Sequence, residues 1–489
     1  MTALRLLYSS NAFWAASGYG VQGKSLLPRL AALPQLGGKQ NIAQFAWWGL
    51  QGGIHEVDGF RIYPQFNDPY GNDVIGSHAQ HFGANWVVTL IDAWVLRNTA
   101  ESIKPALFCP WLPIDHDPVP EAVLQSIKGA YMPITYAKWG HELLTKAGVE
   151  NVYIPHGIET GTYRVNPNHE QARDFKRQLT GIEDAFLCVM VAANKGQPDR
   201  KWFQGQYEAF RDFAKDKPNV RLYHHTLMTQ HHGGVDLKEL ANQLGLQGRV
   251  IFPNPYMYQL GYPPDFLAHV YNAADVLLAV AMSEGFGIPI IEAQACGCPV
   301  ITTNFSAMPE LVRWGHLVDV ADLVYTPMKS YQAWPSKSSM LDKLQRLYEA
   351  WEIAGGDWPL VKRVATSAAI HAEYDWDAIV RDQWAPFVER VAEDAPPLNL
   401  QYRAAVAPVP AQDDVADFVD AVQEGIEAER KPQRRIAPLV KPDTELTFEQ
   451  AHEMSKRKSR SAQAIAEEME RNGNGAYEAV SDEEAQVPA

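Results

Sequence analysis

Short apolar runs alternate with helix-like stretches along most of the chain, a pattern typical of parallel α/β sheets. The first series predicts strands at Leu4–Ser9, Phe45–Trp48, Trp86–Ile91, Leu107–Leu112 and Val152–Pro155, with helices at Val21–Leu33 and Lys138–Ala147. The second series predicts strands at Phe186–Ala192, Val220–His224, Val250–Phe252, Val276–Val280 and Pro299–Thr302. Two such sheets indicate two Rossmann-like domains whose strands point their carboxyl ends into a common cleft.

We therefore expect an N-terminal domain over residues 1–160 and a C-terminal domain over residues 161–375. From residue 394 the pattern changes. Proline-rich and basic stretches there separate two short helical patterns, Val415–Glu429 and Phe448–Arg471. Residues 394–489 are interpreted as an acidic tail, partly helical and partly disordered, and not as a third catalytic domain.

Composition limits the classes of function. No apolar stretch reaches the roughly 18 residues that span a bilayer, and the start shows no signal-peptide pattern, so we expect a cytoplasmic protein. A net charge of −15 argues against general affinity for nucleic acid or anionic membranes, although a local basic groove in the first domain stays open. The four cysteines predict neither a disulfide framework nor a metal site, because no second ligand pair accompanies Cys296 and Cys298.

The densest chemical signal runs from Ser283 to Glu292 (Ser-Glu-Gly-Phe-Gly-Ile-Pro-Ile-Ile-Glu), between two predicted strands. Its glycines let the backbone approach a ligand, and its proline suits the first turn of a helix. The free N–H groups of such a turn bind anions, so a diphosphate fits there. Glu284 before the helix and Glu292 within it offer oxygens to different hydroxyls of one ligand. The alternative is an ordinary glycine-rich turn with two solvated glutamates.

Polar residues also follow strands of the first domain. Asp115, His116 and Asp117 follow one strand, and Asp92 follows another. Ionisable groups at such strand ends suit a site in the cleft, but a buried, hydrogen-bonded structural role is an equal alternative for His116 and Asp92. The turn Ser17-Gly-Tyr-Gly20 precedes a helix and is by itself a weak indicator of phosphate binding.

The stretch from Ser283 to Glu292 resembles the signature of the family 4 (group 1) glycosyltransferases of the GT-B fold. The resemblance continues upstream in Phe266–Asp275 and downstream in Thr302–Asn304, Met308–Val312 and Gly315–Asp319, in the family's order. It covers roughly residues 1–390 and implies two facing Rossmann-like domains with an interdomain cleft. It also implies that a helix at about 376–393 returns to complete the first domain.

The resemblance implies roles for individual residues. Glu292 would hold the nucleotide ribose and Glu284 the donor sugar, while the backbone of Gly285, Phe286, Gly287 and Ile288 holds the phosphates and sugar. Lys201 matches the family lysine that neutralises the diphosphate. Either Asn194 or Lys195 stands at the family arginine, with Lys195 favoured and Arg200 in reserve. In the first domain the resemblance assigns Gly18 and Gly20 to the glycine loop and His116 to the donor sugar. His156 replaces an asparagine usual at the interdomain hinge.

The implied function is retaining transfer of a sugar from a UDP- or GDP-linked donor to an acceptor hydroxyl, with no metal and no further cofactor. The alternatives are a catalytically inactive nucleotide-sugar-binding scaffold with a partner-recruiting tail, and an epimerase or phosphorylase. The acceptor stays open among a glycan or metabolite, a protein and a hydroxymethylated DNA base. Asp375-Trp-Asp377 imitates a metal-binding motif, as do the pairs His224-His225 and His231-His232, but each has a structural explanation.

Overall fold

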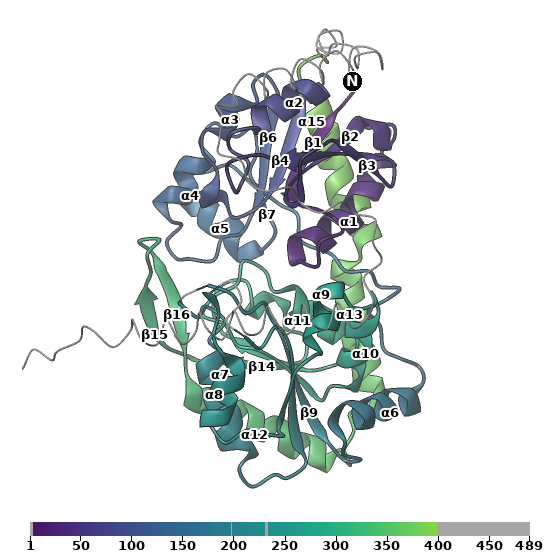
Figure 1. Ribbon diagram of the computed structural model, residues 1–489, viewed down its shortest axis with the longest axis vertical. Helices are drawn as coiled ribbons and strands as arrows, with labels where there is room; N and C mark the ends of the chain where they lie inside the picture. Colours follow the sequence, from purple (N-terminus) through teal and green to yellow (C-terminus); the bar gives the residue numbers. More distant parts are fainter. Residues whose placement is uncertain (1–2, 197, 230–232, 399–489) are drawn as a thin grey trace, which may run out of the picture. The chain divides into compact units, whose positions relative to one another are not determined.

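The computed structural model describes residues 3–196, 198–229 and 233–398, all of which belong to one compact unit, Met1–Val406 (Figure 1). The tail helices expected at Val415–Glu429 and Phe448–Arg471, like His231 and His232, lie outside the described residues.

An eight-stranded sheet forms the first lobe, in the order β3-β4-β2-β1-β5-β6-β7-β8. Neighbouring strands pair in parallel except β3, which is antiparallel to β4. The strands are β1 (Leu6–Asn11), β2 (Ile42–Gln51), β3 (His55–Val57), β4 (Phe60–Gln65), β5 (Trp86–Leu90), β6 (Leu107–Leu112), β7 (Ile134–Thr135) and β8 (Val152–Tyr153). The helices are α1 (Gly18–Ala31), α2 (Ile75–Phe82), α3 (Thr99–Ser102), α4 (Glu121–Ser126) and α5 (Lys138–Lys146), with 3₁₀ turns η1 (Lys39–Asn41) and η2 (Ala93–Val95).

A six-stranded parallel sheet forms the second lobe, in the order β11-β10-β9-β12-β13-β14. Its strands are β9 (Phe186–Val191), β10 (Val220–His225), β11 (Val250–Ile251), β12 (Val276–Ala279), β13 (Val300–Thr303) and β14 (Gly315–Val318). Its helices are α6 (His169–Thr180), α7 (Phe203–Ala214), α8 (Leu237–Gln243), α9 (Pro255–Leu260), α10 (Phe266–Ala273), α11 (Ile288–Ala295), the 3₁₀ turn η4 (Pro309–Leu311), α12 (Lys337–Ile353) and α13 (Leu360–Tyr374). A separate antiparallel hairpin of β15 (Val320–Tyr325) and β16 (Tyr331–Pro335) precedes α12.

The chain then returns to the first lobe through α14 (Trp376–Ile379), a π-helical turn η5 (Val380–Trp384) and α15 (Ala385–Asp394). Trp384 packs edge-on against Trp111 of β6, with ring centroids 5.3 Å apart, and Phe387 lies 6.3 Å from Trp86 of β5. Asn85 donates a hydrogen bond of 3.0 Å to the carbonyl of Pro396. These contacts make the returning segment part of the first lobe's core.

Both predicted series of strands are present, and the two Rossmann-like sheets confirm the α/β fold class. The strongest predictions were the strands buried on both faces, such as β1 and β6, because helices cover both sides of a parallel sheet. The hairpin β15–β16 was not predicted. Most of the residues of β15 are exposed although most of its side chains are apolar, so it is not a strand of the buried kind on which the predictions rested. No helix in the described part of the chain combines the length and apolarity needed to cross a membrane.

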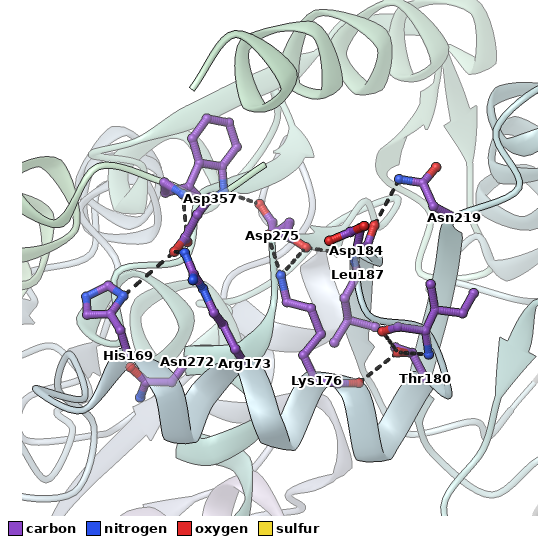
Figure 2. A network of polar contacts seen from close by, with 12 residues as sticks. His169, Arg173, Lys176, Thr180, Asp184, Leu187, Asn219, Asn272, Asp275 and Asp357 are labelled. Carbon is purple, nitrogen blue, oxygen red and sulfur yellow. Dashed lines mark hydrogen bonds and ion pairs between the residues drawn. The ribbon is translucent and has the colours of Figure 1, made fainter. Parts of the chain in front are cut away.

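A buried ion pair ties α6 to the amino ends of β9 and β12 (Figure 2). The carboxylate of Asp275 accepts two hydrogen bonds of 2.8 Å from Lys176 and one of 2.7 Å from the backbone N–H of Leu187. Arg173, on the same face of α6, donates to Asp357 at 2.9 Å. Asp275 is 2% exposed, so this network holds the amino ends of the two central strands together, while the candidate site lies at their carboxyl ends.

Candidate functional site

The candidate site lies where the strand order of each sheet reverses. β1 is flanked by β2 and β5, and β9 by β10 and β12, so a crevice opens beyond the carboxyl ends of each pair. Residues following these strands in both lobes line one cavity of about 340 Å³. From the first lobe it receives Gly18, Asp92 and Asp115, and from the second Lys195 and Lys201.

The amino end of α11 forms one wall of this cavity. Gly287 caps the helix with φ +111°, a conformation that favours glycine, and Pro289 occupies its first turn. A side chain at Gly285 would collide with Pro113 of the first lobe, so glycine there permits close approach of the lobes. Gly285, Phe286, Gly287 and Ile288 all line the cavity, and the free N–H groups of the first turn favour an anion.

Glu284 joins this wall to two cations. Its carboxylate accepts hydrogen bonds from the ammonium of Lys201 and, at 3.4 Å, from Arg200, whose guanidinium also donates to the carbonyl of Ser283. Burial would raise the pKa of Glu284, but Lys201 and Arg200 outweigh burial and hold that pKa below its usual value. Glu284 is therefore an ionised, cation-bound carboxylate beside an anion-binding helix end, and not a solvated one.

Glu292 has a different environment. It lies one turn into α11, is 6% exposed, and accepts a hydrogen bond of 3.1 Å from the hydroxyl of Tyr271. Burial raises its pKa to about 7, against the lowering effect of hydrogen bonds from Tyr163 and Tyr271. Glu292 is not among the residues lining the cavity and sits behind its wall.

The first lobe contributes two carboxylates. Asp115 accepts a hydrogen bond of 2.7 Å at Oδ1 from the ring Nδ1 of His116. Asp92 has no side-chain hydrogen-bond partner among the described residues, and burial together with Asp115 raises its pKa to about 6. Both aspartates line the cavity, whereas His116 lines a second cavity of about 1190 Å³ that shares Asp92, Asp115, Lys195 and Arg200 with the first.

The remaining predicted residues fall into two groups. Lys195 and Gly18 line the cavity, and His156 lines it while stacking on Tyr136 at 4.1 Å. Asn194 and Gly20 do not line it: Asn194 is buried and donates to the carbonyl of Val235 at 2.7 Å, and the N–H of Gly20 donates to Ser17. The arrangement thus brings Lys195, not Asn194, beside the two cations.

Sequence reasoning placed Asp115 in a polar site with His116 and Asp117 but singled out His116, and it assigned no site role to Tyr19, Tyr136 or Tyr271. Tyr19 lies within the glycine turn, so it had a local signal. Tyr136 and Tyr271 had none. They reach the site because β7 and α10 pack beside it, which only the assembled fold determines.

The motifs that imitate metal sites are occupied by protein contacts. Asp375 caps α14, accepting from the N–H of Ala378 at 3.0 Å, and Asp377 pairs with Arg29 at 2.6 Å. His224 bonds the hydroxyl of Tyr207 at 2.9 Å. Over the described ranges, no group of three or more His, Cys, Asp or Glu side chains converges at metal-binding distance.

The chain resembles known glycosyltransferases in part of its sequence and in its fold. Residues 189–329 match the family model described as glycosyl transferases group 1. The D-inositol 3-phosphate glycosyltransferase of Acidothermus cellulolyticus is 29% identical over 178 residues, which are 35% of this chain and 37% of that protein. The enzyme of the same name from Rhodococcus opacus is 46% identical over 79 residues, 16% of each chain. The match therefore spans 37% of the length of the first of these curated relatives and 16% of the second.

Two solved structures share the fold over nearly all the described residues. Sucrose-phosphate synthase from Thermosynechococcus elongatus has a TM-score of 0.59 at 15% identity, covering 80% of this chain and 100% of that one. Anabaena HepE, solved in complex with UDP-glucose, has a TM-score of 0.57 at 14% identity, covering 80% and 99%. Residues 189–329 therefore match the group 1 glycosyltransferase family, and the described part of the chain has the GT-B fold of these solved structures.

Proposed function

We propose that this protein transfers a sugar from a nucleotide-diphosphate donor, UDP- or GDP-linked, to an acceptor hydroxyl with retention of the anomeric configuration. One observation carries the proposal: the amino end of α11, Lys201 and Arg200 converge on one cavity between the lobes. A leaving diphosphate develops negative charge, and preorganised cations and N–H groups at that point lower the barrier.

Each residue receives a separate task. Lys201, Arg200 and Lys195 neutralise the diphosphate, and the backbone from Gly285 to Ile288, with Gly18 opposite, encloses it. Glu284 accepts hydrogen bonds from the donor sugar, and Glu292 from the ribose. Glu292 sits behind the cavity wall, so this role requires the ribose to enter between α11 and Tyr271.

The chemical step needs no protein nucleophile. The acceptor oxygen forms a bond to the anomeric carbon on the face that the diphosphate leaves, and the bond from that carbon to the diphosphate oxygen breaks. The acceptor's proton passes to that phosphate oxygen. Asp92 and Asp115, at the junction of the two cavities, orient the acceptor hydroxyl, and His116 holds Asp115.

The test is a panel of UDP- and GDP-sugars, with nucleotide release followed in the presence and absence of acceptors. Slow donor hydrolysis that acceptors accelerate, with NMR showing retained configuration in the product, supports the proposal. Nucleotide-sugar binding in calorimetry without any release would favour the scaffold. Conversion of the donor without an acceptor into an isomeric nucleotide sugar would favour an epimerase.

A further inference from the structure

We infer that the acceptor is an uncharged, hydroxyl-bearing ring compound, stacked on Trp94 and Trp334 in the cavity of about 1190 Å³ beneath the β15–β16 hairpin, and not a phosphorylated sugar. This inference rests on the proposed transferase function and specifies its second substrate. It distinguishes this chain from structural neighbours that are named for a phosphorylated sugar, such as sucrose-phosphate synthase.

The position of the larger cavity assigns it to the acceptor. It shares Asp92, Asp115, Lys195 and Arg200 with the smaller cavity, so the two meet at one wall of charged side chains. If the donor diphosphate lies at the amino end of α11, a molecule in the larger cavity reaches the anomeric carbon from across that wall.

The hairpin closes this cavity and is fastened to both lobes. Tyr331 and Asp117 exchange two backbone hydrogen bonds, of 3.2 and 3.3 Å, and Ser330 donates to the carbonyl of Pro118. On the other side the N–H of Ala333 donates to Met282 at 3.1 Å. An isolated two-stranded hairpin is marginally stable, so these contacts set its place.

Aromatic rings on this cavity are unusually accessible. Trp94 is 49% exposed, Trp334 46% and Tyr325 61%, and all three line the cavity. In the strand register Trp334 shares its face of the hairpin with Gln332 and Val324, which also line it. Exposed ring faces in a concave site bind other rings, including the apolar faces of sugars, by stacking.

The charged side chains that line this cavity disfavour binding of a phosphate group. Among the described lining residues there are four carboxylates, Asp92, Asp115, Asp199 and Glu208, but three Lys or Arg side chains, Lys195, Arg200 and Lys337. With Lys195 and Arg200 assigned to the donor diphosphate, the cation left to this cavity is Lys337, which is paired with Glu208 at 3.1 Å. A phosphomonoester acceptor would have to break that pair or lie against the carboxylates, whereas a neutral hydroxyl can donate to Asp92.

The first experiment compares matched probes: glucose with glucose 6-phosphate, fructose with fructose 6-phosphate, and myo-inositol with its 3-phosphate. Their binding to the UDP-loaded protein is measured by saturation-transfer NMR, which needs no turnover. We expect each neutral probe to bind about tenfold or more tightly than its phosphorylated partner. Equal or tighter binding of the phosphorylated probes overturns the inference.

Substitutions locate the contacts. W94A and W334A should weaken binding of the neutral probes by about tenfold, the loss expected for an aromatic stack. W48A is the matched control, because Trp48 is 50% exposed and lines neither cavity. Donor hydrolysis should stay within twofold in the W48A control. If the unmodified protein does not hydrolyse any donor, the proposed function itself is wrong. Unchanged probe binding in W94A and W334A would overturn only the acceptor assignment.

A second pair of variants tests the charge argument. Glu208→Gln releases Lys337 and should reduce the preference for neutral over phosphorylated probes at least threefold. Glu349→Gln is the control, because Glu349 also accepts from a glutamine one turn away but lies outside both cavities. An identical preference in the two variants overturns the charge argument.

Discussion

The second sheet has a lysine–carboxylate pair at each end of the adjacent strands β9 and β12. At the amino ends, Lys176 meets Asp275; at the carboxyl ends, Lys201 meets Glu284. Asp275 is closed in by the N–H of Leu187, and burial outweighs Lys176, so its pKa is raised. Glu284 has a second cation, Arg200, and its pKa is lowered despite burial.

The two ion pairs differ in whether a ligand can reach them. Neither Lys176 nor Asp275 lines a cavity of the site, whereas Lys201 and Glu284 line the one at the amino end of α11. An enclosed pair can act only on stability, because no ligand can replace either partner. An accessible pair beside a helix end can exchange its partner for a phosphate or a hydroxyl, which is what a donor site requires.

The largest expected effect separates the two pairs directly. Lys201→Met should lower kcat for transfer about 10²- to 10³-fold, because one stabilising contact to the leaving diphosphate is lost, while the melting temperature changes little. Lys176→Met should instead cost about 3–5 kcal/mol of unfolding free energy, because it leaves Asp275 buried and unpaired. Denaturant unfolding and steady-state kinetics on both variants measure this crossed pattern.

Conservative variants complete this comparison. Lys201→Arg should recover part of the transfer rate, whereas Asp275→Asn combined with Lys176→Met should recover part of the stability lost in Lys176→Met alone. A Lys176→Met protein that is fully stable but inactive would contradict the division between structural and functional ends.

The next effect distinguishes the two glutamates of the α11 segment. Glu292→Gln should weaken UDP or GDP binding by about 1.5–3 kcal/mol, the value of hydrogen bonds to a charged group, because a ribose contact is lost. Glu284→Gln should spare nucleotide binding and lower turnover, because it frees Lys201 and Arg200 for the diphosphate but removes a contact to the sugar. Calorimetry with the free nucleotide measures its affinity for each variant. Equal weakening of nucleotide binding in both variants would contradict this division of roles.

The sequence predicted more of the residues that line the cavity at the amino end of α11 than of those that line the larger cavity beside the hairpin. Glu284, Lys201 and the glycines up to Gly287 lie in contiguous motifs, where a strand end and a helix start fix their positions locally. The hairpin residue Trp334 carries no such signal. Its place depends on backbone contacts between Tyr331 and Asp117, which are far apart in the sequence.

The charge states of the two glutamates also could not be predicted from the sequence. Glu284 and Glu292 belong to one ten-residue motif, yet cations surround the first and tyrosines the second. Tyr163 and Tyr271 come from separate segments that the fold brings to α11. Residue spacing determines which groups can lie near each other, but burial decides their protonation, and burial is a property of the whole lobe.

A smaller effect follows from the raised pKa of Glu292. Between its unfolded pKa near 4.5 and its folded pKa of about 7, the unfolded chain loses a proton that the folded protein keeps. Rising pH in that window therefore favours unfolding, by at most about 2 kcal/mol between pH 5.5 and 8, and the effect levels off above pH 7. Glu292→Gln should remove this part of the slope in urea unfolding. An identical pH dependence in the two proteins would show that Glu292 is ionised throughout.

The smallest expected effect is that of metal removal: transfer in millimolar EDTA should stay within twofold of the untreated rate. The leaving diphosphate already has Lys201, Arg200, Lys195 and the first turn of α11 to offset its charge, so a divalent ion adds little. The Asp-Trp-Asp motif has other partners, since Asp375 caps α14 and Asp377 pairs with Arg29. A complete loss in EDTA, restored by Mg²⁺ or Mn²⁺, would contradict this account. The unpaired carboxylate of Asp92 and its neighbour Asp115 would then be the ligands to test, since both face the cavity where the diphosphate leaves.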